Sequence, residues 1–251
     1  MKLLKTLLSI PLTILFYLAF AGILVVFHFI QLIFYYLIGK SAHKKSVDWL
    51  NFLLMRTPLI LGTRIEIIGL EKLPDSRSVI IASNHQSMMD IPPIIWLLRK
   101  HHVKFIAKKE LTNLVPSISF NLKKGGSLLI DRKKGKETIQ QIFDYAGSIK
   151  ELGYSVCIFP EGTRGKHGIT KEFKSGGLQA LVDGSEGVTI VPFVVHGNYK
   201  IFQKGMFPLQ IGQKVAYEVL DPIDPKQIKS VDLTQVVQSK IEDSLRQRGI
   251  N

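Results

Sequence analysis

The stretch "SNHQSMMD" (83–90) carries an imidazole and a carboxylate five positions apart, at His85 and Asp90. An aspartate can accept a hydrogen bond from one ring nitrogen of a histidine, and the other nitrogen is then able to take a proton from a hydroxyl. The chain has no G-x-S-x-G motif that would supply a nucleophilic serine. We therefore interpret the pair as a general base for a hydroxyl of a substrate. Metal binding by the pair is a weaker alternative, because no third or fourth ligand follows at a recognisable spacing.

Two further motifs end in an arginine. "GSLLIDR" (126–132) ends in Arg132, and "FPEGTRG" (159–165) holds Arg164 between small residues. The planar guanidinium matches phosphate in a bidentate way, and neighbouring backbone amides add further donors. Taken singly, each arginine also suits an ordinary surface ion pair.

These motifs must be positioned by regular elements. Apolar runs separated by amphipathic segments predict an α/β fold with a mainly parallel sheet flanked by helices. The expected strands are 64–69, 78–83, 103–108, 127–131, 154–159, 188–195 and 214–220, and the expected helices are 89–100, 109–122, 136–152, 173–183 and 233–248. His85, Arg132 and Arg164 each follow a strand, so we expect them at the same carboxyl edge of the sheet, where open α/β folds place their sites. Pro192 lies inside a strand and indicates an edge, a bulge or a bend.

The first forty residues differ from the rest. Residues 6–39 contain no Lys, Arg, Asp or Glu, and as one helix this run would extend about 50 Å. That is too long for one ordinary membrane span of about 20 residues. Three interpretations compete: a helical hairpin bent near Ala21-Gly22, a single tilted span, and a signal peptide cleaved after 19–21.

Positive charge lies at both ends of this run, which favours placing both ends on the cytoplasmic face of a membrane. The lysines concerned are Lys2, Lys5, Lys40, Lys44 and Lys45. We expect residues 1–40 to form a hydrophobic helical membrane anchor and residues 41–251 to form one catalytic domain.

The net charge of +13 suits partners that carry phosphate. These include anionic membrane lipids, a phosphorylated small substrate and nucleic acid. Nucleic acid is not expected, because no zinc-ligand spacing, RNP-type aromatic run or basic heptad region occurs. The single cysteine, Cys157, lies in an apolar run and cannot form an internal disulfide.

The motifs together resemble the glycerophospholipid acyltransferase family, and specifically 1-acylglycerol-3-phosphate O-acyltransferases. "NHQSMMD" is similar to the family's first block, N-H-x-S-x-x-D, and "GSLLIDR", "FPEGTR" and "VPFVV" resemble the next three blocks in order. "FIAKKEL" resembles a further family segment, with Lys108 at its basic position. The resemblance covers residues 64–200. Gly165 replaces the serine that often follows Thr-Arg, and Leu128-Leu129 stand where an aromatic residue is common.

This resemblance implies the glycerolipid acyltransferase fold. It also implies transfer of an acyl chain from acyl-CoA or acyl carrier protein to lysophosphatidic acid, which would give phosphatidic acid without an acyl-enzyme. His85 would be the general base and Asp90 its orienting partner. The expected substrate-binding residues are Lys108, Arg132, Glu161, Gly162, Thr163 and Arg164, among which the arginines would bind phosphate. No cofactor and no metal are implied. The alternatives are an acyltransferase for glycerol-3-phosphate or another lysophospholipid, and a non-catalytic membrane-tethered phospholipid-binding protein.

Overall fold

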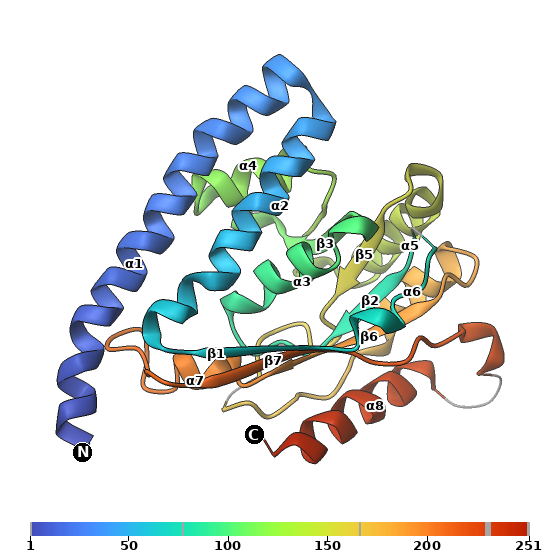
Figure 1. Cartoon of the computed structure of the whole chain (residues 1–251). Coiled ribbons are helices and arrows are strands. Elements are labelled where there is room, and N and C mark those ends of the chain that lie inside the picture. Colours follow the sequence, from blue (N-terminus) through green and yellow to red (C-terminus); the bar gives the residue numbers. More distant parts are fainter. Residues whose placement is uncertain (1, 77, 166, 229–231, 250–251) are drawn as a thin grey trace.

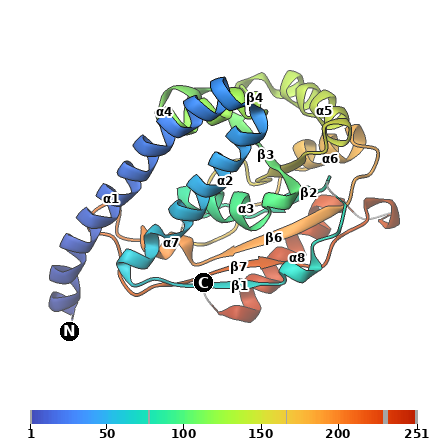
Figure 2. The same cartoon turned by 45° about the horizontal axis from the view of Figure 1, so that its top comes forward.

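The computed structural model describes residues 2–76, 78–165, 167–228 and 232–249, with the backbone alone at residues 2, 3, 132 and 150. Seven strands form one sheet in the order β1-β7-β6-β2-β5-β3-β4 (Figures 1 and 2). Their bounds are β1 Arg64–Ile68, β2 Ile80–Ser83, β3 Val103–Lys108, β4 Leu128–Ile130, β5 Ser155–Ile158, β6 Ile190–His196 and β7 Lys214–Val219. Every strand that the sequence predicts is therefore formed.

The central part of the sheet is parallel. β6, β2, β5, β3 and β4 all run in one direction, whereas β7 pairs antiparallel with β6 and parallel with β1. The prediction of a mainly parallel sheet is confirmed. The carboxyl ends of β2, β3, β4 and β5 consequently meet at one edge, which is the edge that holds the candidate site.

Pro192 is not on an edge strand, because β6 lies between β2 and β7. It lies at a bulge in the pairing of β6 with the chain after β7. Phe193 of β6 pairs with Val219, but Ile190 pairs with Ile223. The segment from Val219 to Ile223 therefore has one residue more between these two pairs than β6 has. Of the predicted alternatives the bulge is confirmed.

Helices cover both faces of the sheet, and each face has its own apolar core. α1 (Lys2–Ile33), α2 (Lys40–Arg56) and α3 (Ile91–Leu97) cover one face, where Phe16, Ile94 and Phe193 are buried. α5 (Gly135–Leu152), α6 (Ser175–Gly184) and α8 (Leu233–Arg248) cover the other. Figure 1 shows α8 below the sheet and α1, α2 and α3 above it. The shorter α4 (Pro116–Lys124) follows β3, and α7 (Asn198–Ile201) follows β6.

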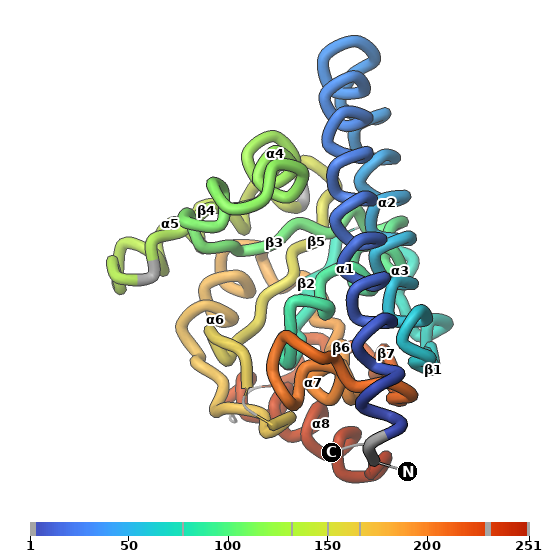
Figure 3. Tube along the Cα trace, turned by 90° about the vertical axis from the view of Figure 1, so that its left-hand side faces the viewer, coloured from blue at the N-terminus to red at the C-terminus, as the bar shows by residue number. Residues whose placement is uncertain are grey.

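The predicted bend near Ala21-Gly22 is wrong. α1 continues through these residues, because one glycine inside a helix costs only about 1 kcal/mol and does not interrupt it. The chain turns instead at Gly39, after the π-helical turn Phe34–Ile38. Gly39 has φ 118°, a conformation that glycine adopts without steric cost. α2 then returns antiparallel alongside α1 (Figures 1 and 3).

α1 packs against the rest of the protein along most of its length. Near one end, the Leu209 amide donates to Thr13 Oγ1 at 2.9 Å, and near the other, Gln31 Nε2 donates to Ser117 Oγ at 2.9 Å. The opposite face of α1 is an exposed apolar stripe, formed by Leu4, Leu7, Leu8, Ile14, Leu15, Leu18, Val25, Val26, Phe29 and Ile33. Among the described residues one helical segment, Leu4–Ile38, is long and apolar enough to cross a membrane, by length and composition alone.

Candidate active site

His85 and Asp90 lie on the turn between β2 and α3, as predicted. His85 Nδ1 is 2.7 Å from Asp90 Oδ2, and the Asp90 side chain is fully buried. Since the carboxylate accepts, Nδ1 carries the proton and Nε2 has its lone pair available. The side chain of His85 is 15% exposed, so the ring is accessible from one side. The pair can therefore take a proton from a hydroxyl at Nε2.

The sequence places Asp90 in this position through a tight helical turn. Ser87 caps the turn Met88–Asp90, and Asp90 Oδ2 accepts from the backbone amides of Gln86 and Ser87 at 2.6 and 2.8 Å. Pro92 and Pro93 follow in the first turn of α3, where proline is tolerated. With this spacing of five residues, the Asp90 carboxylate bonds both the backbone amides of the turn and the imidazole of His85.

Two residues from distant parts of the chain complete the surroundings of Asp90. Asn198 Nδ2 donates to Asp90 Oδ1 at 2.8 Å, and Tyr217 Oη donates to Asn198 Oδ1 at 3.1 Å. Burial raises the pKa of Tyr217, so its hydroxyl stays a donor. Neither residue was predicted from the sequence, because neither lies in a motif that indicates chemistry.

The face of the His85 ring is covered by Phe159. The two rings are stacked with centroids 4.1 Å apart, and Phe159 is followed in turn by Phe105, whose centroid is 6.3 Å from that of Phe159. These aromatic rings limit the orientation of the imidazole. They also begin an apolar wall that leads inward from the base.

Glu161 is buried behind the His85 turn. Its Oε1 accepts from the His85 amide at 2.7 Å, and its Oε2 accepts from the Lys171 amide at 3.0 Å. Burial raises the pKa of Glu161, and these two backbone bonds oppose that shift by stabilising the carboxylate. The Gly165 amide also donates to the His85 carbonyl at 2.8 Å. The segment after β5 is thus attached to the turn that bears the base.

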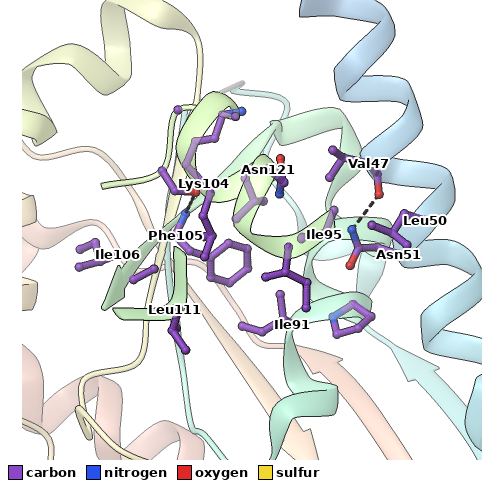
Figure 4. Close-up of a pocket in the computed structure, with 18 of the residues that line it drawn as sticks. Val47, Leu50, Asn51, Ile91, Ile95, Lys104, Phe105, Ile106, Leu111 and Asn121 are labelled. Carbon is purple, nitrogen blue, oxygen red and sulfur yellow. Dashed lines mark hydrogen bonds between the residues drawn. The ribbon is translucent and has the colours of Figure 1, made fainter. Parts of the chain in front are cut away.

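One cavity of about 990 Å³ opens at this edge. Five of the predicted site residues line it, namely His85, Lys108, Gly162, Thr163 and Arg164. Its inner wall is mainly apolar and comes from α2, α3, β3 and the segment 111–122 (Figure 4). A cavity with an apolar interior and cationic groups at its mouth suits an amphiphile with an anionic head.

The remaining predicted residues lie at different distances from the base. Arg164 follows β5, the direct neighbour of β2, and Lys108 ends β3 one strand further along. Arg132 begins a 3₁₀ turn after the outermost strand, β4, so three inter-strand steps of about 4.8 Å separate it from β2. The side chain of Arg132 lies outside the described part of the chain.

Cys157 is fully buried in β5, and burial raises the pKa of its thiol well above the usual value. A thiol of this kind remains protonated and inaccessible, so it does not act as a nucleophile. This burial agrees with the position of Cys157 in an apolar run of the sequence.

Comparisons with known proteins point to acyltransferases. An acyltransferase family model matches residues 64–196. The chain is 29% identical to the 1-acyl-sn-glycerol-3-phosphate acyltransferase alpha of Ovis aries over 194 residues, which cover 77% of this chain and 66% of that protein. It is 25% identical to the 1-acyl-sn-glycerol-3-phosphate acyltransferase of Borreliella burgdorferi, covering 78% of this chain and 79% of that one. The crystal structure of the 1-acyl-sn-glycerophosphate (LPA) acyltransferase PlsC from Thermotoga maritima shares the fold, with a TM-score of 0.79 at 24% identity. This match covers 100% of this chain and 99% of the other.

Proposed function

Because this chain belongs to the acyltransferase family, we propose that it transfers a fatty acyl chain from an acyl thioester to the free hydroxyl of 1-acylglycerol-3-phosphate, giving phosphatidic acid. The observation that carries this proposal is the His85–Asp90 pair at the mouth of an apolar cavity that also bears Arg164 and Lys108. The two curated relatives described above are named as acyltransferases for this acceptor, which supports the same acceptor for this chain.

The reaction needs one base and no protein nucleophile. His85 Nε2 takes the proton of the acceptor hydroxyl as its oxygen attacks the thioester carbonyl carbon. The carbon–sulfur bond then breaks, the imidazolium returns the proton to sulfur, and the thiol leaves. Asp90 stabilises the imidazolium through Nδ1 in the interval between these steps. The acyl chain passes directly to the acceptor.

The cationic mouth of the cavity would bind the phosphate of the acceptor. Arg164 offers a bidentate fork, and Lys108 adds a point charge from the end of β3. Arg132, whose backbone follows β4, stays a phosphate ligand predicted from the sequence alone. A phosphate held there fixes the distance between the head group and the reacting hydroxyl. The thioester donor is proposed to be either acyl-CoA or acyl carrier protein, which present the same bond to the acceptor.

The direct test is formation of labelled phosphatidic acid by the purified protein in mixed micelles. Lysophosphatidic acid, glycerol-3-phosphate and a lysophospholipid with a larger head group should be compared as acceptors, each with acyl-CoA and acyl carrier protein. We expect the highest kcat/KM with lysophosphatidic acid. A preference for another acceptor would change the substrate, and binding of lysophosphatidic acid without turnover would favour a phospholipid-binding protein.

Glu161 provides a prediction about positioning. The Glu161 carboxylate accepts hydrogen bonds from two backbone amides. We therefore expect Glu161 to hold the Arg164 segment against the His85 turn without contacting the acceptor. Glu161→Gln retains one acceptor oxygen and replaces the other with a donor, which leaves the Lys171 or the His85 amide unpaired. Loss of such a buried bond costs about 1–3 kcal/mol.

We expect Glu161→Gln to lower kcat by about tenfold or more, with comparable losses on phosphorylated and neutral acceptors. Steady-state kinetics with lysophosphatidic acid and monoacylglycerol would measure this, with thermal unfolding as a check of the fold. A loss confined to KM for lysophosphatidic acid would mean that Glu161 contacts the acceptor instead.

The apolar stripe of α1 is proposed to lie in the plane of the membrane on the cytoplasmic face. Two observations support an in-plane helix over a single span, since Thr13 and Gln31 contact the catalytic part at well-separated points. A helix that crossed the bilayer would carry these partners into hydrocarbon, where polar groups are costly. The boundary between an anchor at 1–40 and a catalytic part at 41–251 stays a prediction, since Phe16 of α1 is buried in the same core as the sheet.

Charges on this stripe should release the protein from membranes. We expect Leu18→Glu, Val25→Glu and Phe29→Glu, combined in one variant, to shift most of the protein from the membrane to the soluble fraction, because acidic groups disfavour the acyl region. Phe143→Glu, at an exposed position of α5, is the matched control and should leave the protein in the membrane fraction. Membrane flotation measures the distribution. Retention of the triple variant would refute the in-plane anchor, and labelling of an N-terminal tag only from the far side would establish a span.

A further inference from the structure

The Asp90 carboxylate lies entirely inside the protein. Its side chain is fully buried, and among the described residues no lysine or arginine forms an ion pair with it. An ionised carboxylate in such surroundings is strongly unfavourable unless hydrogen bonds and a cationic partner stabilise it. The donors around Asp90 therefore decide how strongly it attracts the imidazolium of His85.

Four of the five described donors belong to the turn that carries Asp90. Oδ2 accepts from His85 Nδ1 and from the amides of Gln86 and Ser87, and Oδ1 accepts from Ser87 Oγ at 3.2 Å. The fifth donor is Asn198 Nδ2, at 2.8 Å from Oδ1. It forms the shorter of the two bonds to Oδ1, and it alone among these donors comes from outside the turn.

Asn198 is positioned by the end of β6. It is the first residue of α7 and directly follows Gly197, which turns the chain with φ 75°. β6 lies beside β2 in parallel, so the end of β6 and the start of the His85 turn meet at one edge of the sheet (Figure 2). Asn84 joins the two strands there, because its side chain bonds both the amide and the carbonyl of Val195, at 2.8 and 2.9 Å. The Asn198 side chain is itself fully buried.

Tyr217 of β7 fixes the amide of Asn198. Its hydroxyl donates to Asn198 Oδ1 at 3.1 Å, and its side chain is buried in the core beneath α1–α3. Burial, followed by the negative charge of Asp90, raises the pKa of Tyr217, so the hydroxyl keeps its proton. An amide whose oxygen accepts from this hydroxyl presents its NH₂ group to Asp90. One chain of hydrogen bonds thus runs from Tyr217 through Asn198 and Asp90 to His85.

We propose that Asn198 and Tyr217 are positioning residues that orient the Asp90 carboxylate and set the pH range in which His85 is the free base. This inference rests on the proposed acyl transfer. Loss of the Asn198 donor would leave the negative charge of Asp90 less stabilised. The carboxylate would then attract the imidazolium more strongly and would also take up a proton more readily. Both effects remove the active form at low pH, so both move the acid limb of the pH profile of kcat to higher pH.

Asn198→Leu is the central variant, because leucine has a similar size and cannot donate. The kcat values should be measured from pH 5 to pH 8 with saturating lysophosphatidic acid and thioester. We expect the midpoint of the acid limb to rise by about half to one pH unit, on the scale of one hydrogen bond to a charged group. The plateau of kcat should fall by about tenfold, because the base is less well oriented. KM should change by less than about twofold for both substrates, because Asn198 does not line the cavity.

Other titratable groups face the His85–Asp90 pair. They are Cys157 of β5, Glu161 after β5, Tyr217 of β7, and Lys108 and Arg164 in the cavity wall. Burial raises the pKa of Cys157 and of Tyr217, so both stay protonated over this pH range. Burial also raises the pKa of Glu161, but this group is present in wild type and in every variant. The difference between their midpoints therefore reports the loss of the Asn198 donor.

Tyr217→Phe tests the second step, because it keeps the ring and removes only the hydroxyl. We expect a smaller shift in the same direction, since Asn198 can still donate. If Tyr217 acts through Asn198, the double variant should shift the midpoint no further than Asn198→Leu alone. A further shift in the double variant would overturn the proposed chain of hydrogen bonds. Where Asn198→Leu does not fold, the shift in Tyr217→Phe decides the question.

The alternative is that both residues only stabilise the fold. A smaller amount of folded enzyme lowers the apparent kcat equally at every pH and leaves the midpoint unchanged. Ser244→Ala is the matched control, since Ser244 Oγ donates at 2.7 Å to Glu218, the neighbour of Tyr217 in β7, on the face that α8 covers. It should lower the thermal unfolding temperature and leave the midpoint where it is in wild type.

The protonation of His85 can also be followed without turnover. Diethyl pyrocarbonate modifies the neutral imidazole, and the tryptic peptide 78–99 contains no other histidine. The rate of modification of this peptide, measured by mass spectrometry against pH, should show the same upward shift in Asn198→Leu. Unchanged midpoints of kcat and of modification in the folded variant would overturn this inference and leave acyl transfer standing. Absence of transfer by wild type with every thioester would instead overturn the proposed function, and with it the role of this pair in acyl transfer.

Discussion

Replacing His85 by alanine lowers the rate of acyl transfer by about two to four orders of magnitude, which is the usual contribution of a positioned general base. No other described side chain in the Asp90 network can take over the role: Asn198 has no basic group, and Tyr217 is a buried donor with a raised pKa. The measurement is the single-turnover rate with lysophosphatidic acid and a saturating thioester. The fold should persist, because His85 lies on a turn at the mouth of the cavity.

Two companion variants make this result interpretable. Cys157→Ser removes the only thiol, and transfer should continue because that thiol is buried and protonated. Asp90→Asn should also cost activity, but Asp90 accepts from two backbone amides and from Asn198, so this change disturbs the turn as well. Near-normal turnover by a folded His85→Ala protein would remove the base from the mechanism, and loss of turnover in a folded Cys157→Ser protein would indicate a thiol intermediate.

Replacing Arg164 by alanine raises the KM for lysophosphatidic acid by about tenfold to a hundredfold, equivalent to the loss of a charge-assisted hydrogen bond of about 1.5–3 kcal/mol. Arg164→Lys keeps the charge and loses the fork, so we expect an intermediate loss. The KM for a neutral monoacylglycerol should change much less, because it has no phosphate. Acceptor kinetics with both compounds measure the difference. A fall in kcat would show in addition that the hydroxyl is displaced from His85.

Arg246, an exposed arginine on α8, is a suitable control. Arg246→Ala removes one positive charge, as Arg164→Ala does, but at a position outside the site motifs. It should leave both KM values unchanged. Equal losses on the phosphorylated and the neutral acceptor in Arg164→Ala would mean that the guanidinium holds the loop. The choice of acceptor would then need a different phosphate ligand.

The order and spacing of local motifs made much of this molecule predictable. The strand runs, the turn at "SNHQSMMD" and the common edge for His85 and Arg164 follow from patterns within a few residues, because parallel strands place their carboxyl ends together. Asn198 and Tyr217 could not be found in this way. Their approach to Asp90 depends on β6 lying beside β2 and on β7 running antiparallel to β6, and strand order is not encoded in local pattern.

Lys104 and the hairpin turn show a second limit. The strand run "VKFIAK" gives no sign of the neighbours of Lys104, because only the return of α2 across the cavity brings Asp48 and Lys44 close to it. In the N-terminal run, Gly22 and Gly39 are both candidates for a turn. Packing decides between them, because beyond Gly22 α1 remains in contact with α2 through Leu24 and with α4 through Gln31.

The hydrogen bond between Thr13 and Leu209 joins residues 196 positions apart, and this affects how the chain is made. Ribosomes add about 5–20 residues per second, so α1, which ends at Ile33, is complete about 9 to 35 s before its partner near Leu209 exists. During that time its inner face, with Phe16, lacks the part of the core that β6 and β7 supply. A nearby lipid surface would cover the apolar helix during this interval. Synthesis close to a membrane would therefore protect the nascent chain from aggregation and also bring the protein to the membrane.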